Sequence, residues 1–429
     1  MEEMKGAKGH DRYLQVLREE LIPALGCTEP IAIAYGAAKA RAVLGVFPEK
    51  IMAVCSGNVI KNVKGVIVPT TGNMKGIETS AILGALAGNA DKKLEVLSEV
   101  TSQDIEKTKG LLGEKICEVA LAEGVENLYI KITVSSGQDW ASVTISDGHT
   151  NITEMVKNGE VIYQEAGMSA DGAGGGTGKS DRGFLTLKGI YDFVNQASAA
   201  SLKSVLQEQV DLNSQIAEEG MTGDYGANVG KTLLKTYGER VENLAKAYAS
   251  AGSDARMSGC VMPVVINSGS GNQGLTVSLP VVVYAKELQV SEEKLYRALA
   301  LSNLVSIYIK SQIGKLSAYC GAVSASCGSG AAIAYLHDAG YQVIADTIVN
   351  TLANTSGIVC DGAKASCAAK IASSVDAAIM GYHMASKGNT FHPGDGLVKE
   401  DVDKTIASVC RMAKHGMKET DVEILKIMI

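Results

Sequence analysis

The strongest constraint on the fold is the spacing of apolar residues after position 184. From there onward they recur with a helical period almost throughout, which is typical of helices that bury one face. We find no internal repeat and no coiled-coil heptads. The pattern predicts a helical bundle with long segments near residues 185–219, 229–251, 292–313, 331–353 and 365–384.

Residues 91–161 have a different character. A charged amphipathic segment predicts a helix at residues 101–122. After it, apolar residues alternate with polar ones, which predicts strands at residues 128–134, 140–145 and 151–156. This part of the chain therefore reads as a small α+β unit.

The length of the chain, 429 residues, exceeds the usual size of one domain, so two domains are expected. We predict an α+β fold in which a small α+β domain, residues 91–164, is inserted into a mainly helical catalytic domain. The larger domain would comprise residues 1–90 plus 165–429.

The N-terminal region predicts a sharp turn at Cys27. Apolar spacing favours a helix at residues 14–25, which Gly26 ends. Thr28 can then cap a second helix that has Pro30 in its first turn. Further along, short strands are expected at residues 51–55 and 63–68, and a helix at residues 77–87.

Charge and composition exclude several classes of protein. The net charge is −7, with no cluster of Lys or Arg and only 4 Phe and 1 Trp, so a nucleic-acid partner is not expected. The first residues lack the apolar core of a signal peptide, and polar residues 267–273 interrupt the most apolar stretch, residues 260–285. We therefore expect a soluble cytoplasmic protein without a membrane partner.

The nine cysteines are the most informative residues for chemistry. In a reducing compartment their spacing indicates metal binding or catalysis before disulfides. Two pairs have an i, i+7 spacing within segments rich in Gly, Ala and Ser, namely Cys320 with Cys327 and Cys360 with Cys367. Such a set could hold a metal, although the CxxC pairs usual in structural zinc sites are absent. The alternative, small buried residues, stays open.

Four segments together resemble the L-cysteine desulfidase family, a relative of the iron-sulfur L-serine dehydratases. They are Gly26-Cys27-Thr28-Glu29-Pro30, Ser56-Gly57-Asn58, Gly269-Ser270-Gly271-Asn272-Gln273-Gly274 and the set Cys320, Cys360 and Cys367. The resemblance covers nearly the whole chain. It implies a 4Fe-4S cluster held by Cys320, Cys360 and Cys367, one iron open to substrate, and no pyridoxal phosphate. The helical domain would then be the cluster-bearing one, and Cys327 is a possible replacement for one of the three ligands.

The chemistry implied is the β-elimination of L-cysteine, a small-molecule amino acid, to pyruvate, ammonia and hydrogen sulfide. A base must remove the α-proton while the sulfur leaves, and an open iron can bind that sulfur as a Lewis acid. Cys27 precedes a helix whose dipole would favour its thiolate, so it is our candidate for the catalytic base. His392 is a candidate second acid or base, although a loop histidine is usually structural.

Substrate-binding residues are expected in the remaining motifs. Polar side chains and Gly-rich backbone could bind the carboxylate and ammonium of the substrate, and the candidates are Asn58, Ser270, Asn272, Gln273, Thr28, Glu29 and Lys61. Thr28 and Glu29 could equally be capping residues, Lys61 a solvated charge, and Ser270 to Gln273 a plain loop.

Competing functions remain at this stage. Residues 173–180 nearly match a phosphate-binding loop that ends in Lys179, but no apolar strand leads into it. A cover over an active site is the more natural assignment. An iron-sulfur L-serine dehydratase would use the same mechanism with hydroxide as the leaving group. A nucleotide-binding protein and a non-catalytic iron-sulfur sensor are the alternatives from other classes, and a homo-oligomer stays open.

Overall fold

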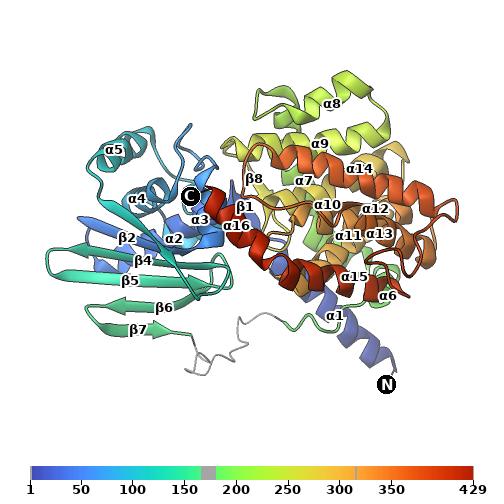
Figure 1. The fold of residues 1–429 in the computed structure, drawn as a ribbon, viewed down its shortest axis with the longest axis horizontal. Helices are drawn as coiled ribbons and strands as arrows, with labels where there is room; N and C mark the ends of the chain where they lie inside the picture. The colour runs from blue at the N-terminus through green and yellow to red at the C-terminus, as the bar shows by residue number, and fades with distance from the viewer. Residues whose placement is uncertain (1, 166–179, 315, 429) are drawn as a thin grey trace.

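The computed structural model describes residues 2–165, 180–314 and 316–428. A sheet with its covering helices occupies one side of the molecule, and a helical bundle occupies the other (Figure 1). The predicted α+β, mainly helical fold is confirmed. No helix among the described residues is both long enough and apolar enough to cross a membrane.

The main sheet has six strands in the order β3-β2-β4-β5-β6-β7. The β2–β3 pair is parallel and the other neighbours are antiparallel. Alternate residues of β4, among them Ile130, Ile132 and Val134, are buried, as expected for a sheet with one covered face. The strands are β2 (Lys50–Ser56), β3 (Cys117–Ala122), β4 (Tyr129–Ser136), β5 (Asp139–Ser146), β6 (Ile152–Lys157) and β7 (Glu160–Gln164).

Helix α2 (Thr28–Leu44) covers this sheet, packing against β4 and β5 and against helix α4 (Ile77–Ala87). The domain boundary predicted at residue 91 does not fit this arrangement, because β2 lies between β3 and β4 in the sheet. The α+β part therefore takes in chain from before residue 91. The remaining elements around it are α3 (Gly57–Lys64), η1 (Ala90–Glu95) and α5 (Ser102–Gly113).

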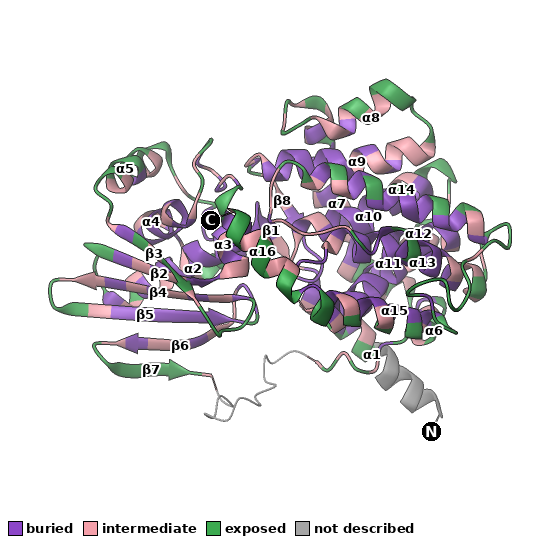
Figure 2. Ribbon diagram, in the orientation of Figure 1, coloured by how far each residue is buried: buried purple, intermediate pink, exposed green. Residues whose placement is uncertain are grey.

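The helical bundle contains a central helix, α12 (Gly321–Leu336), which packs against α10, α11, α13 and α14. Most residues of the helices at the centre of this bundle are buried (Figure 2). The other helices of this part are α6 (Leu187–Gln196), α7 (Ala199–Thr222), α8 (Val229–Tyr237), α9 (Val241–Met257), α10 (Gly271–Glu287), α11 (Glu292–Ile313), α13 (Tyr341–Thr355), α14 (Cys367–Ala385) and α15 (Val402–Arg411).

The segments near the two ends of the chain pack between the α+β part and the helical bundle. After α1 (Glu2–Glu20), the short strand β1 (Pro23–Leu25) pairs antiparallel with β8 (Pro263–Val265), which precedes α10. At the other end, η2 (Met412–Gly416) leads into α16 (Lys418–Met428), which packs on α3. Residues 14–25 are therefore a helix followed by a strand, not the single helix predicted.

Other local predictions are also wrong. Residues 63–68 were expected as a strand, but Val63 belongs to α3. The helix expected at residues 101–122 ends at Gly113, and β3 follows it. In the bundle, the single segments expected at residues 185–219, 229–251 and 331–353 each divide into two helices.

A close contact between helices α2 and α4 depends on Gly84. A Cβ atom at this position would lie 2.3 Å from the carbonyl oxygen of Ala34 and 2.5 Å from its Cα, and backbone cannot move aside as a side chain can. We expect Gly84→Ala to lower the free energy of unfolding by about 1–3 kcal/mol, measured by urea denaturation. Gly110→Ala is the control, because a Cβ atom at that position would have no other atom within 4 Å. Its free energy of unfolding should stay the same or rise by about 0.5–1 kcal/mol. Equal midpoints for the two variants would contradict the packing argument.

Candidate functional site

Four of the nine cysteines line one cavity, of about 100 Å³, between the helical bundle and the start of α2. They are Cys27, Cys320, Cys360 and Cys367. Far apart in the sequence, they are brought together by the fold. The cavity is therefore the candidate active site.

A short backbone bridge places Cys320 beside Cys360. Tyr319 and Val359 form an antiparallel β-bridge. The Cys320 amide donates to the carbonyl of Ile358 at 3.1 Å, and the Cys360 amide donates to the carbonyl of Ala318 at 2.6 Å. The two loops thus hold each other in register, and backbone hydrogen bonds fix the main chain at Cys320 and Cys360.

The N-termini of four helices meet at this cavity. Cys27 precedes α2, Ser270 precedes α10, Cys320 precedes α12, and Cys367 is the first residue of α14. All four residues line the cavity. Free backbone N–H groups and the positive end of the helix dipole favour an anion at such positions, and four of them together make the cavity suitable for negative charge.

Burial favours the neutral form of two of these thiols, those of Cys320 and Cys367. Burial, together with the neighbouring Cys360, raises the pKa of Cys320 to about 12, against the opposing effect of the Ala322 amide. Burial also raises the pKa of Cys367, opposed by the Lys364 amide. Since a metal ligand must be a thiolate, metal binding would release protons from these groups.

Lys310 adds a buried positive charge to the same wall. Its side chain is buried and lines the cavity. Burial lowers the pKa of Lys310, whereas Cys360 and Cys320 nearby act to raise it. No carboxylate within the described part of the chain forms an ion pair with this ammonium group. A buried unpaired cation is costly, so thiolates or another anion would stabilise it.

The thiol of Cys27 is hydrogen-bonded to a carboxylate. Its S–H donates to Oε2 of Glu29 at 3.1 Å, and Asn62 donates to Oε1 of Glu29 at 3.2 Å. The ring of His149 lies beside the carboxylate, with Nε2 at 3.6 Å from Oε1, just beyond hydrogen-bonding distance. Burial alone would raise the pKa of Glu29, but His149 and the Cys27 hydrogen bond lower it to about 2, so the group is a carboxylate.

The expectation of a Cys27 thiolate favoured by the helix dipole is wrong for this structure. Burial, and then the negative charge of Glu29, raise the pKa of Cys27 well above its usual range, and the charge of Arg256 opposes them only in part. The cap is also shifted by one residue from the prediction, because Cys27 and not Thr28 is the N-cap of α2. Thr28 instead donates to the carbonyl of Gly269 at 3.0 Å.

The predicted substrate-binding residues divide between two neighbouring cavities. Those that line the cysteine cavity are Thr28, Glu29, Ser270, Asn272 and Gln273. Asn58 and Lys61 line a second cavity of about 750 Å³, which shares Leu316 and Ser317 with the first.

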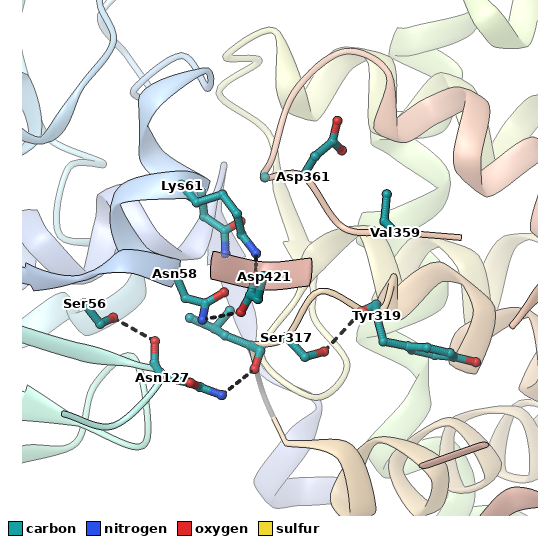
Figure 3. A network of polar contacts seen from close by, with 12 residues as sticks. Ser56, Asn58, Lys61, Asn127, Ser317, Tyr319, Val359, Asp361 and Asp421 are labelled. Atoms are coloured by element: carbon teal, nitrogen blue, oxygen red, sulfur yellow. Dashed lines mark hydrogen bonds and ion pairs between the residues drawn. The ribbon is translucent and has the colours of Figure 1, made fainter. Parts of the chain in front are cut away.

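In that second cavity both side chains contact helix α16 (Figure 3). Asn58 donates to Asp421 at 2.8 Å, and the ammonium of Lys61 lies 2.5 Å from the same carboxylate. Their partner in this structure is therefore Asp421.

Three further candidates lie outside the cysteine cavity. His392 is exposed in a loop, where its amide donates to Asp395. Cys327 is fully buried within α12. Of the Gly-rich segment, residues 173–179 lie outside the described residues, and Ser180 is hydrogen-bonded to Glu19.

Several residues of the cavity wall were not predicted from the sequence, among them Asn62, His149, Arg256 and Lys310. His149 follows strand β5 in a polar turn, and that position is the only signal that could have suggested it. Arg256 and Lys310 lie in the last turns of α9 and α11. A basic residue there normally reads as a partner of the helix dipole.

Three cysteines of the cavity provide the thiol donors that iron-sulfur clusters use. Within residues 2–165, 180–314 and 316–428, no three His, Cys, Asp or Glu side chains are grouped closely enough to hold one ion. A cluster makes a different demand, because each thiolate binds a different iron. Three thiols around a cavity with helix N-termini and Lys310 meet that demand for an anionic group.

Comparison with known proteins identifies a family of enzymes that this chain resembles. The family described as serine dehydratase alpha chain matches residues 91–426. A UPF0597 protein of Desulfitobacterium hafniense is 52% identical over 98% of this chain and 97% of its own length. A second, from Lachnoclostridium phytofermentans, is 50% identical over 98% of this chain and 100% of its own.

The family match indicates a lyase-type enzyme, and its fold holds a cysteine-lined cavity. The chain belongs to the serine dehydratase alpha chain family.

Proposed function

We propose that this protein is an L-cysteine desulfidase, a carbon-sulfur lyase independent of pyridoxal phosphate. It would convert L-cysteine to pyruvate, ammonia and hydrogen sulfide. The observation that supports this most is the meeting of Cys320, Cys360 and Cys367 with Cys27 at one cavity. That arrangement allows three thiols to hold a cofactor and one to move a proton.

The cofactor we propose is a 4Fe-4S cluster held by Cys320, Cys360 and Cys367. When bound, it would supply an open iron that acts as a Lewis acid toward the sulfur of the substrate. The free N–H groups at the starts of α12 and α14, together with Lys310, would balance its negative charge. This assignment leaves Cys27, which hydrogen-bonds Glu29, free for proton transfer.

In the proposed reaction, Cys27 accepts the α-proton of the substrate. The electron pair of that C–H bond forms the α,β double bond, and the bond from the β-carbon to sulfur breaks, so that sulfide leaves. Water then converts the aminoacrylate to pyruvate and ammonia. Cys27 must first lose its own proton to water, and the charge of Arg256 and the backbone amide of Glu29 both favour its thiolate. In the resting thiol form, Glu29 orients the sulfur by accepting the hydrogen bond of its S–H.

The decisive experiment is an anaerobic assay of protein reconstituted with iron and sulfide. We expect L-cysteine to yield sulfide and pyruvate in equal amounts, because one elimination releases both. L-serine serves as the matched substrate, since it differs only in the leaving group, and the family match makes it the natural competitor. Faster pyruvate formation from L-serine would make the protein a serine dehydratase. No turnover of either substrate by a fully loaded sample would reject the lyase and favour a sensor.

A further inference from the structure

Four side chains that line the cysteine cavity, those of His149, Arg256, Gln273 and Tyr319, each have a buried polar atom without a hydrogen-bond partner, and two of these atoms carry the argument. One is the donor Nε of Arg256, and the other is the acceptor Oε1 of Gln273. Both residues line the cavity and are almost fully buried, Arg256 at 2% exposed and Gln273 at 5%. Buried polar groups are nearly always paired, so an unpaired donor and an unpaired acceptor at one cavity point to a ligand.

The surroundings of Arg256 are electrostatically unfavourable without an anion. Its guanidinium lies against Gly271, the first residue of α10, where a Cβ would be 2.3 Å from Nε. A positive side chain therefore sits at the positive end of a 17-residue helix. No carboxylate of the described residues forms an ion pair with Arg256, and a buried unpaired charge is strongly destabilising.

The neighbouring side chains orient the Arg256 guanidinium without neutralising its charge. Its Nη1 donates to Oδ1 of Asn272 at 3.1 Å. The amide oxygen is neutral, so it orients the guanidinium without cancelling its charge. Ser270 caps the same helix through a bond from the Gln273 amide. Arg256 and Cys27, the residue proposed to move the proton, line the same cavity, and the charge of Arg256 acts to lower the pKa of Cys27.

We propose that Arg256, with the N-terminus of α10, binds the carboxylate of the substrate, and that Gln273 Oε1 accepts from its ammonium group. This inference rests on the proposed function and narrows its substrate class to free α-amino acids. A carboxylate satisfies both the guanidinium and the helix N-terminus. An ammonium supplies the donor that Gln273 lacks. The substrate's sulfur is left for the cofactor end of the cavity.

Substrates with and without the carboxylate charge test the assignment. L-cysteinamide keeps the thiol and the ammonium of L-cysteine but replaces the carboxylate by a neutral amide. A site built to bind a charged group rejects the analogue that lacks it, so kcat/KM should favour L-cysteine by about 10²-fold or more. In Arg256→Gln this preference should collapse to within about tenfold, through loss of activity on L-cysteine alone.

Binding of L-alanine gives a readout that needs no turnover. It has the same carboxylate and ammonium but no leaving group. In calorimetry with the cluster-loaded protein, we expect L-alanine to bind at least tenfold more weakly to Arg256→Gln than to the parent, and L-alaninamide to bind both weakly. Weakened L-alanine binding in a protein that releases no sulfide from L-cysteine would uphold the subsite and reject only the desulfidase activity.

Asn272→Asp provides a second variant in case Arg256→Gln does not fold. The new carboxylate would pair with Arg256 and repel that of the ligand, so L-alanine binding should fall by a similar factor with the arginine still present. The control is Arg41→Gln, because Nε of Arg41 is also buried without a partner but lies outside the cavity. It should leave L-alanine binding unchanged.

Two results would overturn the proposal. Unchanged L-alanine binding in both Arg256→Gln and Asn272→Asp would show that the carboxylate lies elsewhere. Loss of iron from Arg256→Gln, with iron retained in Arg41→Gln, would show that the anion facing Arg256 is the cluster.

Discussion

Replacing Cys320, Cys360 or Cys367 by alanine should abolish cluster binding, while replacing Cys327 should not. The parent, reconstituted anaerobically, should hold about four iron and four sulfide per chain, as a 4Fe-4S cluster requires. Three thiolates are the least that can anchor it with one iron open, so losing one should remove most of the iron and all turnover. Iron and sulfide analysis, with the absorption spectrum of the cluster, measures this directly.

Cys327 is the matched control because it belongs to the same helix as the Cys320 cap. It is fully buried and does not line the cavity, so its alanine variant tests the loss of a thiol without the loss of a ligand. Full iron content in any of the other three variants would reject that residue as a ligand. Iron loss in Cys327→Ala alone would restore the alternative in which Cys327 replaces one of the three.

Elements with a single dominant signal could be predicted from sequence. The helix expected at residues 292–313 matches α11, which ends at Gly314 with a φ of 105°, and the helix expected at residues 77–87 matches α4. In both, helical periodicity and a glycine stop agree. Strands β4 and β5 also have one dominant signal, the alternation of apolar and polar residues, because one face of the sheet is covered.

Predictions failed where local preference and tertiary context disagree. Val59 and Val63 are β-branched and favour a strand, yet they form the buried side of α3. β3 follows α5 without a proline to stop the helix, and its Leu121 is 44% exposed on an outer strand of the sheet. The alternation of apolar and polar residues that identifies a strand is therefore weak in β3.

The candidate site was predictable only in its chemically unusual residues. Cysteines and Gly-rich motifs can be seen in a sequence, and they led to nine of the 23 described residues that line the cavity. Arg256 and Lys310 could not be found in that way, because what distinguishes them is burial without a carboxylate partner. Whether a basic residue in a last helical turn meets solvent or a cavity is decided by the packing of other helices.

The role of Cys27 gives the second large effect. If it is the base, Cys27→Ala should lower turnover by roughly 10²- to 10⁴-fold, the usual contribution of general-base catalysis. The cluster should remain, because Cys27 is not among its proposed ligands. Cys27→Ser should recover little activity, since a hydroxyl is a far weaker base than a thiolate. Cys55→Ala, which removes a thiol buried in β2 outside the cavity, is the control and should stay close to the parent.

Exchange of the α-proton separates the roles that Cys27 could have. A base is needed to remove that proton, so Cys27→Ala should lose deuterium exchange at the α-carbon in step with turnover, while L-cysteine still changes the absorption spectrum of the cluster. Retained exchange with lost sulfide release would mean that Cys27 protonates the leaving sulfur, a role that suits its raised pKa. The base would then be sought at His149, which lines the same cavity, and not at the exposed His392. Loss of iron would instead make Cys27 a ligand, because the four thiols share one cavity and a base can be removed without loss of the cluster.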